Sequence, residues 1–103
     1  MTDDDAVATP EENNEPPGFE EGWSRVNAVK NSRTPIYISP RTSKAYRINL
    51  YQPNSRSVVA VYLNGEKVTE LRSFNRIIDV DATKIEVQSE ADNTNLIQYM
   101  RLK

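Results

Sequence analysis

The stretch VVAVYLNGEKVTEL, residues 58–71, is the part of the chain that decides the fold. Two extended runs rich in β-branched residues flank Asn64-Gly65, the preferred loop of a two-residue type I′ hairpin, because both residues tolerate positive φ. A two-residue loop places Val61 opposite Val68, so that both faces of the hairpin carry apolar pairs. The stretch therefore predicts a β-hairpin that lies between layers or in an assembly interface.

Further short extended segments lie on both sides of the hairpin. The segment 35–40 is fenced by two prolines, which suits an edge strand. The segment 45–51 alternates between apolar and polar side chains, and others are expected at 77–80, 83–88 and 96–102. Six or seven short strands with turn signals at near-regular spacing predict an all-β fold, a small antiparallel β-sandwich or barrel.

Charge divides the chain into two parts. Residues 1–22 contain eight carboxylates and no base, whereas residues 23–103 contain all 13 bases and the other seven acids, a formal +6. The first part is also rich in proline and poor in large apolar side chains, so it cannot bury enough area to offset its ordering entropy. We therefore expect a disordered, flexible acidic arm at 1–22 and a single β-sandwich domain at 23–103.

The chain contains no His and no Cys. A base working near neutral pH would have to be a carboxylate or a lysine with a shifted pKa. Zinc or iron sites of the usual nitrogen and sulfur type are excluded, and no glycine-rich phosphate loop is present. We therefore expect a protein that is not an enzyme, with no catalytic residue and no cofactor.

Four oxygen-bearing side chains leave a calcium site as an alternative. Asp79 and Asp81 are neighbours on an extended segment, and Asp92 and Asn93 lie in a later loop. They lack the spacing of a calcium-binding loop. A solvated strand followed by a polar turn is the preferred interpretation, and no metal site is expected.

The longest apolar run, 58–63, is far too short to span a membrane. The first residues are acidic rather than basic and apolar, unlike a secretory signal. Since cysteine is absent as well, the chain is expected in the cytoplasm, or in a virion if it is viral, with no membrane partner.

Two groups of side chains are candidates for partner binding. Phe19 and Trp23 are two aromatics at the point where the charge changes sign, and aromatic anchors are typical interface hot spots. Arg25, Arg33 and Arg41 belong to a basic series that contains no acid as far as residue 65. We expect these five residues to contact the partner. The alternative is that Trp23 closes the core of the domain and that the bases form a solvated face.

Tyrosines interleave with the basic series, a composition shared by single-stranded nucleic-acid surfaces on small β-barrels. Tyr46, however, falls on the apolar face of its strand, and the acidic arm would compete for the same bases. Nucleic acid is therefore not the expected partner. A carbohydrate-binding module would need exposed aromatics on a concave face, and the candidates are Tyr37, Tyr51, Tyr62 and Tyr99.

The hairpin VAVYLNGEKV, residues 59–68, together with TKIEV, residues 83–87, resembles the hairpins of jelly-roll and immunoglobulin-like sandwiches. Such sandwiches include carbohydrate-binding modules and the small decoration or accessory proteins of tailed-phage capsids. The resemblance and the arm-plus-domain organisation imply a non-enzymatic structural protein that docks on a larger assembly, with a phage capsid or tail as the best fit and a homo-oligomer left open. The alternative is a carbohydrate- or single-stranded nucleic-acid-binding β module.

Overall fold

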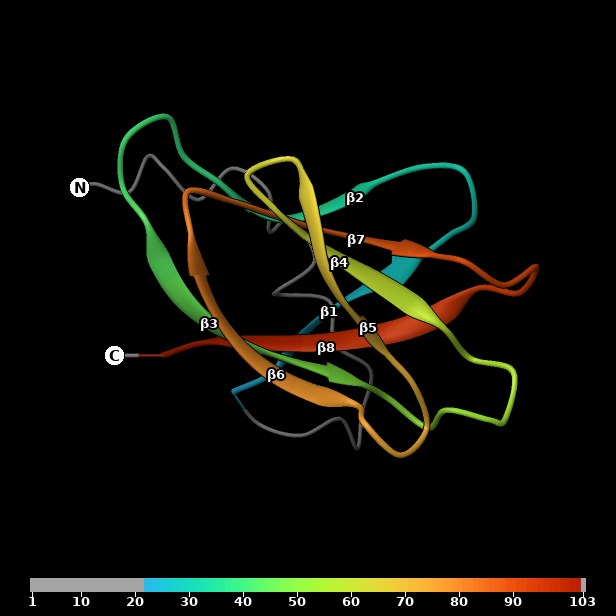
Figure 1. Cartoon of the computed structure of the whole chain (residues 1–103). Helices are drawn as coiled ribbons and strands as arrows, with labels where there is room; N and C mark the ends of the chain where they lie inside the picture. The colour runs from blue at the N-terminus through green and yellow to red at the C-terminus, as the bar shows by residue number, and fades with distance from the viewer. Residues whose placement is uncertain (1–21, 103) are drawn as a thin grey trace.

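A computed structural model describes residues 22–102, and within them it contains eight strands and no helix (Figure 1). The strands are β1 (Ser24–Ala28), β2 (Thr34–Ile38), β3 (Lys44–Leu50), β4 (Val59–Leu63), β5 (Glu66–Leu71), β6 (Ile77–Ala82), β7 (Lys84–Ser89) and β8 (Asn95–Arg101). They form two four-stranded antiparallel sheets, a first sheet of order β1-β8-β3-β6 and a second of order β2-β7-β4-β5. The predicted antiparallel sandwich is confirmed, whereas all but the last residue of the expected arm at 1–22 lies outside the described residues. In the described range, no helix is long and apolar enough to cross a membrane.

The core lies between the two sheets and takes side chains from alternate strand positions. In β3, Tyr46, Ile48 and Leu50 are buried, as the alternation predicts, while Arg47 is exposed and Asn49 is half-buried. Full burial of a large apolar side chain contributes about 1.5–3 kcal/mol relative to exposure. Burial of the inward-facing side chains therefore holds the two sheets together.

Three tyrosines pack against one another within this core. The ring centroid of Tyr46 lies 5.4 Å from that of Tyr37 and 6.1 Å from that of Tyr99. All three side chains are buried. The Tyr37 hydroxyl donates a hydrogen bond to the carbonyl oxygen of Thr42 at 2.9 Å, so its polar end is satisfied where the ring reaches the edge of the core.

The strand β1 is one that the sequence did not predict. Its only apolar residues are Val26 and Ala28, both buried, and this alternation is too short to stand out in the sequence. Pairing with β8 along one side determines that it is a strand. The prolines at 35 and 40 do mark an edge as predicted, because β2 is an outer strand of the second sheet.

The β4–β5 hairpin has the predicted turn. Asn64 and Gly65 have φ values of 53° and 88°, and Leu63 pairs with Glu66 across the two-residue loop. The side-chain oxygen Oδ1 of Asn64 also accepts a hydrogen bond from Thr83 Oγ1 at 2.8 Å. The turn is therefore tied to the neighbouring β6–β7 connection as well as to its own strands.

Beyond the turn, β5 contains a bulge that the sequence did not predict. The extra residue is Val68, which is 48% exposed, so the predicted pairing of Val61 with Val68 is wrong. Past the bulge Leu71 pairs with Val59 and is buried, while Glu70 lies on the outer face. A one-residue shift exchanges the two faces of a strand. Without the bulge, the carboxylate of Glu70 would oppose Val59 in the core.

Candidate functional site

The five residues predicted to contact a partner do not form one patch. Phe19 lies outside the described residues. Trp23 is half-buried immediately before β1, and Arg25 is on β1 in the first sheet. Arg33 and Arg41 are exposed and flank β2 in the second sheet, one beyond each end. The structure therefore distributes the described members of the set over both sheets.

Of these residues, Arg33 makes the most specific contacts. Its guanidinium carbon lies 3.9 Å from the centroid of the Tyr62 ring, and Nη1 donates a hydrogen bond to the carbonyl oxygen of Gly65 at 3.3 Å. The same nitrogen is 3.9 Å from Glu86 Oε1. A guanidinium over an aromatic face is attracted by the ring quadrupole. Arg33 thus lies across the outer face of the second sheet and covers Tyr62.

Glu86 is the most buried carboxylate on this face, with 9% of its surface exposed. Its Oε1 lies 3.9 Å from Arg33 and 4.0 Å from Lys84 Nζ, and it accepts no hydrogen bond from the described residues. A buried carboxylate is tolerated only when positive charge compensates for its lost hydration. Arg33 and Lys84 provide that charge. The grouping of these two bases with Glu86 is therefore explained by its contribution to the stability of the sheet.

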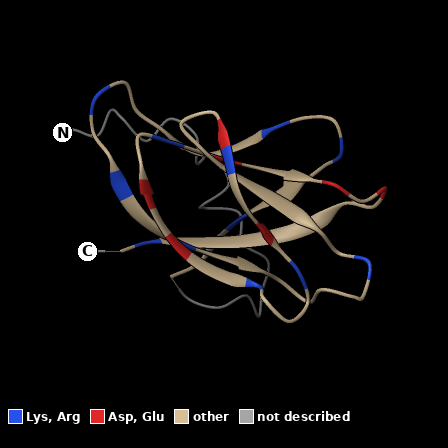
Figure 2. Ribbon diagram, viewed as in Figure 1, with Lys and Arg blue, Asp and Glu red and all other residues tan. Residues whose placement is uncertain are grey.

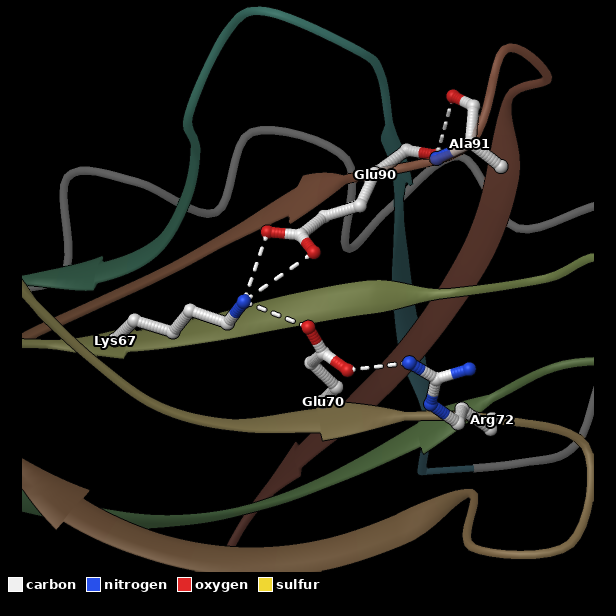
Figure 3. A network of polar contacts seen from close by, with 6 residues as sticks. Lys67, Glu70, Arg72, Glu90 and Ala91 are labelled. Carbon is white, nitrogen blue, oxygen red and sulfur yellow. Dashed lines mark hydrogen bonds and ion pairs between the residues drawn. The ribbon is translucent and has the colours of Figure 1, made fainter.

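A second group of charges lies further along the same face (Figure 3). Lys67 Nζ contacts Glu70 Oε2 at 2.6 Å and Glu90 Oε2 at 3.1 Å, and Arg72 Nη2 contacts Glu70 Oε1 at 2.6 Å. Hydrogen bonds from Lys67 and then from Arg72 lower the pKa of Glu70 to about 2. Those to Glu70 and Glu90 raise the pKa of Lys67. Lys67 and Glu70 therefore stay charged near neutral pH.

Charges are distributed over both sheets and their loops (Figure 2). Most carboxylates of the described residues are held in ion pairs, namely Glu70, Asp79, Glu86, Glu90 and Asp92. Four exposed arginines have no carboxylate within 4.0 Å among those residues, namely Arg41, Arg56, Arg76 and Arg101. Within residues 22–102, the charge that is not held in ion pairs is therefore predominantly positive.

Two of the three carboxylates considered for calcium, Asp79 and Asp92, are engaged elsewhere. Both oxygens of Asp79 accept hydrogen bonds from Arg47, at 2.8 and 3.0 Å, and these lower the pKa of Asp79. Asp92 pairs with Lys30 at 2.5 Å. Residues 22–102 contain no cluster of three or more acids that could hold a metal ion. These geometries favour the solvated-strand interpretation.

The four tyrosines considered for sugar binding differ in their burial. Tyr37 and Tyr99 are buried in the core, so their assignment to an exposed binding face is wrong. The bulge of β2 between Pro35 and Tyr37 contributes to this result, because it turns the ring of Tyr37 inward. Tyr51 and Tyr62 remain half-exposed.

Exposed apolar side chains form a feature that the sequence analysis missed. Among the described residues, the large apolar side chains that are exposed are Val68, Phe74 and Ile77. The position of Phe74 in a turn could have predicted its exposure, since a large apolar residue between two strand ends has no core to enter. The other two depend on the bulge and on the strand order.

Comparison of the chain with protein-family models, with curated proteins and with solved structures gives no match.

Proposed function

We propose that this chain is a non-enzymatic structural protein that docks its sandwich on a larger protein assembly, with a virion as the best fit and a phage capsid or tail as the particular case. The observation that supports this proposal is that most carboxylates of the described residues are held in ion pairs whereas several arginines are not. Carboxylates of the sandwich are mostly neutralised by neighbouring bases, while Arg41, Arg56, Arg76 and Arg101 are exposed with no carboxylate nearby in the described residues.

These arginines suit an extended acidic surface. They come from the β2–β3 loop, the β3–β4 loop, the β5–β6 connection and the end of β8, so they point to contacts spread over the domain. A guanidinium can bind a carboxylate with two parallel hydrogen bonds. Each exposed pair is weak in salt solution, and attachment then depends on several contacts made at once and on many copies.

The acidic segment 1–22 would add a second point of attachment. Its eight carboxylates oppose the +6 of the remaining chain, and Phe19 and Trp23 lie where the sign changes. Exposed carboxylates are screened at physiological ionic strength, with a Debye length of about 8 Å. We therefore expect Phe19 to supply apolar burial on the partner.

A second candidate, a single-stranded nucleic-acid-binding module, is favoured by one observation. Arg33 and Tyr62 present a stacked cation and ring on a half-exposed sheet face, and single strands are bound by aromatic platforms with positive charge. Here the guanidinium already occupies one face of the ring, and a base would have to displace it. The docking proposal therefore remains the better supported one.

The test is sedimentation of the tagged chain from the cells that produce it. We expect co-sedimentation with a large particle and release by salt. Phe19→Ala should weaken attachment to the particle without lowering the melting temperature of the free chain. Trp23→Ala should weaken attachment and also lower the melting temperature. A chain found only in the slow-sedimenting fractions contradicts docking. Salt-sensitive binding of a single-stranded oligonucleotide with low-micromolar affinity would instead establish the second candidate.

A further inference from the structure

Three connections at one end of the sandwich enclose an open pocket. They join β1 to β2, β3 to β4 and β7 to β8, and all three lie at the right of Figure 1. The pocket has a volume of about 480 Å³, and small-molecule sites typically measure about 300–1,000 Å³. We call it the loop-end pocket. The residues that line it are Lys30 from the first connection, Asn54 and Arg56 from the second, and Glu90, Ala91, Asp92 and Asn93 from the third.

Hydrogen bonds hold the three connections together. The amide of Ser89, at the end of β7, donates to the carbonyl oxygen of Val29 at 3.0 Å, and the amide of Glu90 donates to that of Val58 at 2.8 Å. These bonds fix the third connection to the first and to the second. The Ser89 side chain is fully buried, and its hydroxyl donates to the carbonyl oxygen of Asn93 at 2.9 Å. The walls of the pocket are therefore preorganised, which reduces the entropy lost when a ligand binds.

The lining of the pocket is polar and carries both signs of charge. Lys30 and Arg56 are hydrogen-bond donors, and Glu90 and Asp92 are acceptors, while the side-chain amide of Asn93 is both. Among the described residues that line the pocket, none has a large apolar side chain. A simple anion would meet the two carboxylates, and a simple cation would meet the two bases. Each hydroxyl group both donates and accepts hydrogen bonds, so the lining favours a ligand with several hydroxyls, a saccharide.

Arg56 adds a preference for a negative charge on that saccharide. Lys30 and Asp92 form an ion pair of 2.5 Å, and Glu90 pairs with a base outside the pocket. Arg56 is exposed and has no carboxylate within 4.0 Å among the described residues. A guanidinium can bind a carboxylate with two parallel hydrogen bonds. We propose that the loop-end pocket binds a uronate, an acidic sugar whose carboxylate contacts Arg56 and whose hydroxyls contact Asp92 and Asn93.

Titration of the isotope-labelled full chain with trigalacturonate, followed by the amide NMR shifts, tests this proposal. We expect a dissociation constant of about 1 mM or below, with the largest shifts in the three connections that enclose the pocket. The fully methyl-esterified trisaccharide is the matched ligand, because it keeps the ring hydroxyls and loses the charge. It should bind about tenfold more weakly, since a hydrogen bond to an ionised group is roughly twice as strong as one between neutral groups.

Substitutions give the second readout. Arg56→Gln should weaken trigalacturonate binding by about tenfold and leave the affinity for the methyl ester unchanged. Asn93→Ala should weaken the binding of both ligands, and it keeps the backbone carbonyl that Ser89 holds. Arg76→Gln is the matched control, because Arg76 is also exposed with no carboxylate nearby but lies in the β5–β6 connection, outside the pocket. It should bind like the wild type, and thermal melts should show that all three variants are folded.

Three results would overturn the proposal. The first is a wild-type chain that shows no shifts in the pocket up to about 10 mM trigalacturonate. The second is equal affinity for the acid and its methyl ester, or an equal loss of binding in Arg56→Gln and Arg76→Gln. The third is inorganic phosphate that binds the pocket as tightly as trigalacturonate, which would indicate a site for simple anions. Docking to an assembly is tested by sedimentation and by Phe19→Ala, so a failure of one proposal is distinguishable from a failure of the other.

Discussion

Replacement of Gly65 tests how much the hairpin turn contributes to stability. A Cβ built at this position meets no atom within 4 Å, and φ is +88°. Any cost of adding a side chain therefore comes from the backbone conformation and not from a clash with neighbouring elements. For a residue with a Cβ this region costs about 1–2 kcal/mol, and a β-branched residue lies at or above the upper end. We expect Gly65→Ala to lose about 1 kcal/mol and Gly65→Val about 2–3 kcal/mol of unfolding free energy.

The assay is a thermal melt followed by circular dichroism. For a domain of this size 1 kcal/mol corresponds to about 4–8 °C in melting temperature. Gly65→Asn is the matched control, because asparagine adopts positive φ more readily and should lose less than alanine or valine. If Gly65→Val melts at the wild-type temperature, or if asparagine is as harmful as valine, the assignment of the cost to backbone strain in a type I′ turn is wrong.

Two further predictions concern a carboxylate and a hydroxyl. Lys67 and Arg72 lower the pKa of Glu70 from 4.5 to about 2, so the contribution of this carboxylate to stability is present above about pH 4.5 and is lost as the pH falls toward 2. In urea unfolding, the wild type should therefore be more stable than Glu70→Gln at pH 7, and the difference should vanish near pH 2. A difference in stability that does not depend on pH would contradict this prediction. Tyr37→Phe removes the hydrogen bond to Thr42 from a buried ring and should lower unfolding free energy by about 0.5–1.5 kcal/mol; an unchanged denaturation midpoint would mean that this bond contributes nothing net.

The sequence predicts the elements of this fold better than their pairing. The alternation in β3 and the Asn64-Gly65 turn are local signals, and the structure agrees with both. The bulge at Val68 carries no comparable signal, because both registers begin at the same turn. What decides between them is whether Leu71 or Glu70 faces the core, and that depends on the opposing sheet. β1 was missed for a similar reason, since β8 is what makes it a strand.

The candidate site shows the same division. Arg33 could be selected from the sequence as part of a basic series, but its stacking on Tyr62 joins the residue just before β2 to a residue of β4, and these two strands are not adjacent in the sheet. The burial of Tyr37 and Tyr99 follows from the contact of both rings with Tyr46 in the core between the sheets. No spacing along the chain distinguishes these two tyrosines from the half-exposed Tyr51 and Tyr62.

By itself the sequence determined the all-β class, the position of the hairpin turn and the difference in charge between residues 1–22 and 23–103, because each depends on residues that are neighbours in the chain or on a sum of charges. Only the tertiary structure decided the register of β5, the inward direction of two tyrosines and the exposure of Val68 and Ile77. These features depend on strand order and on which face of each strand meets the other sheet. Both are properties of long-range packing, which a local pattern does not encode.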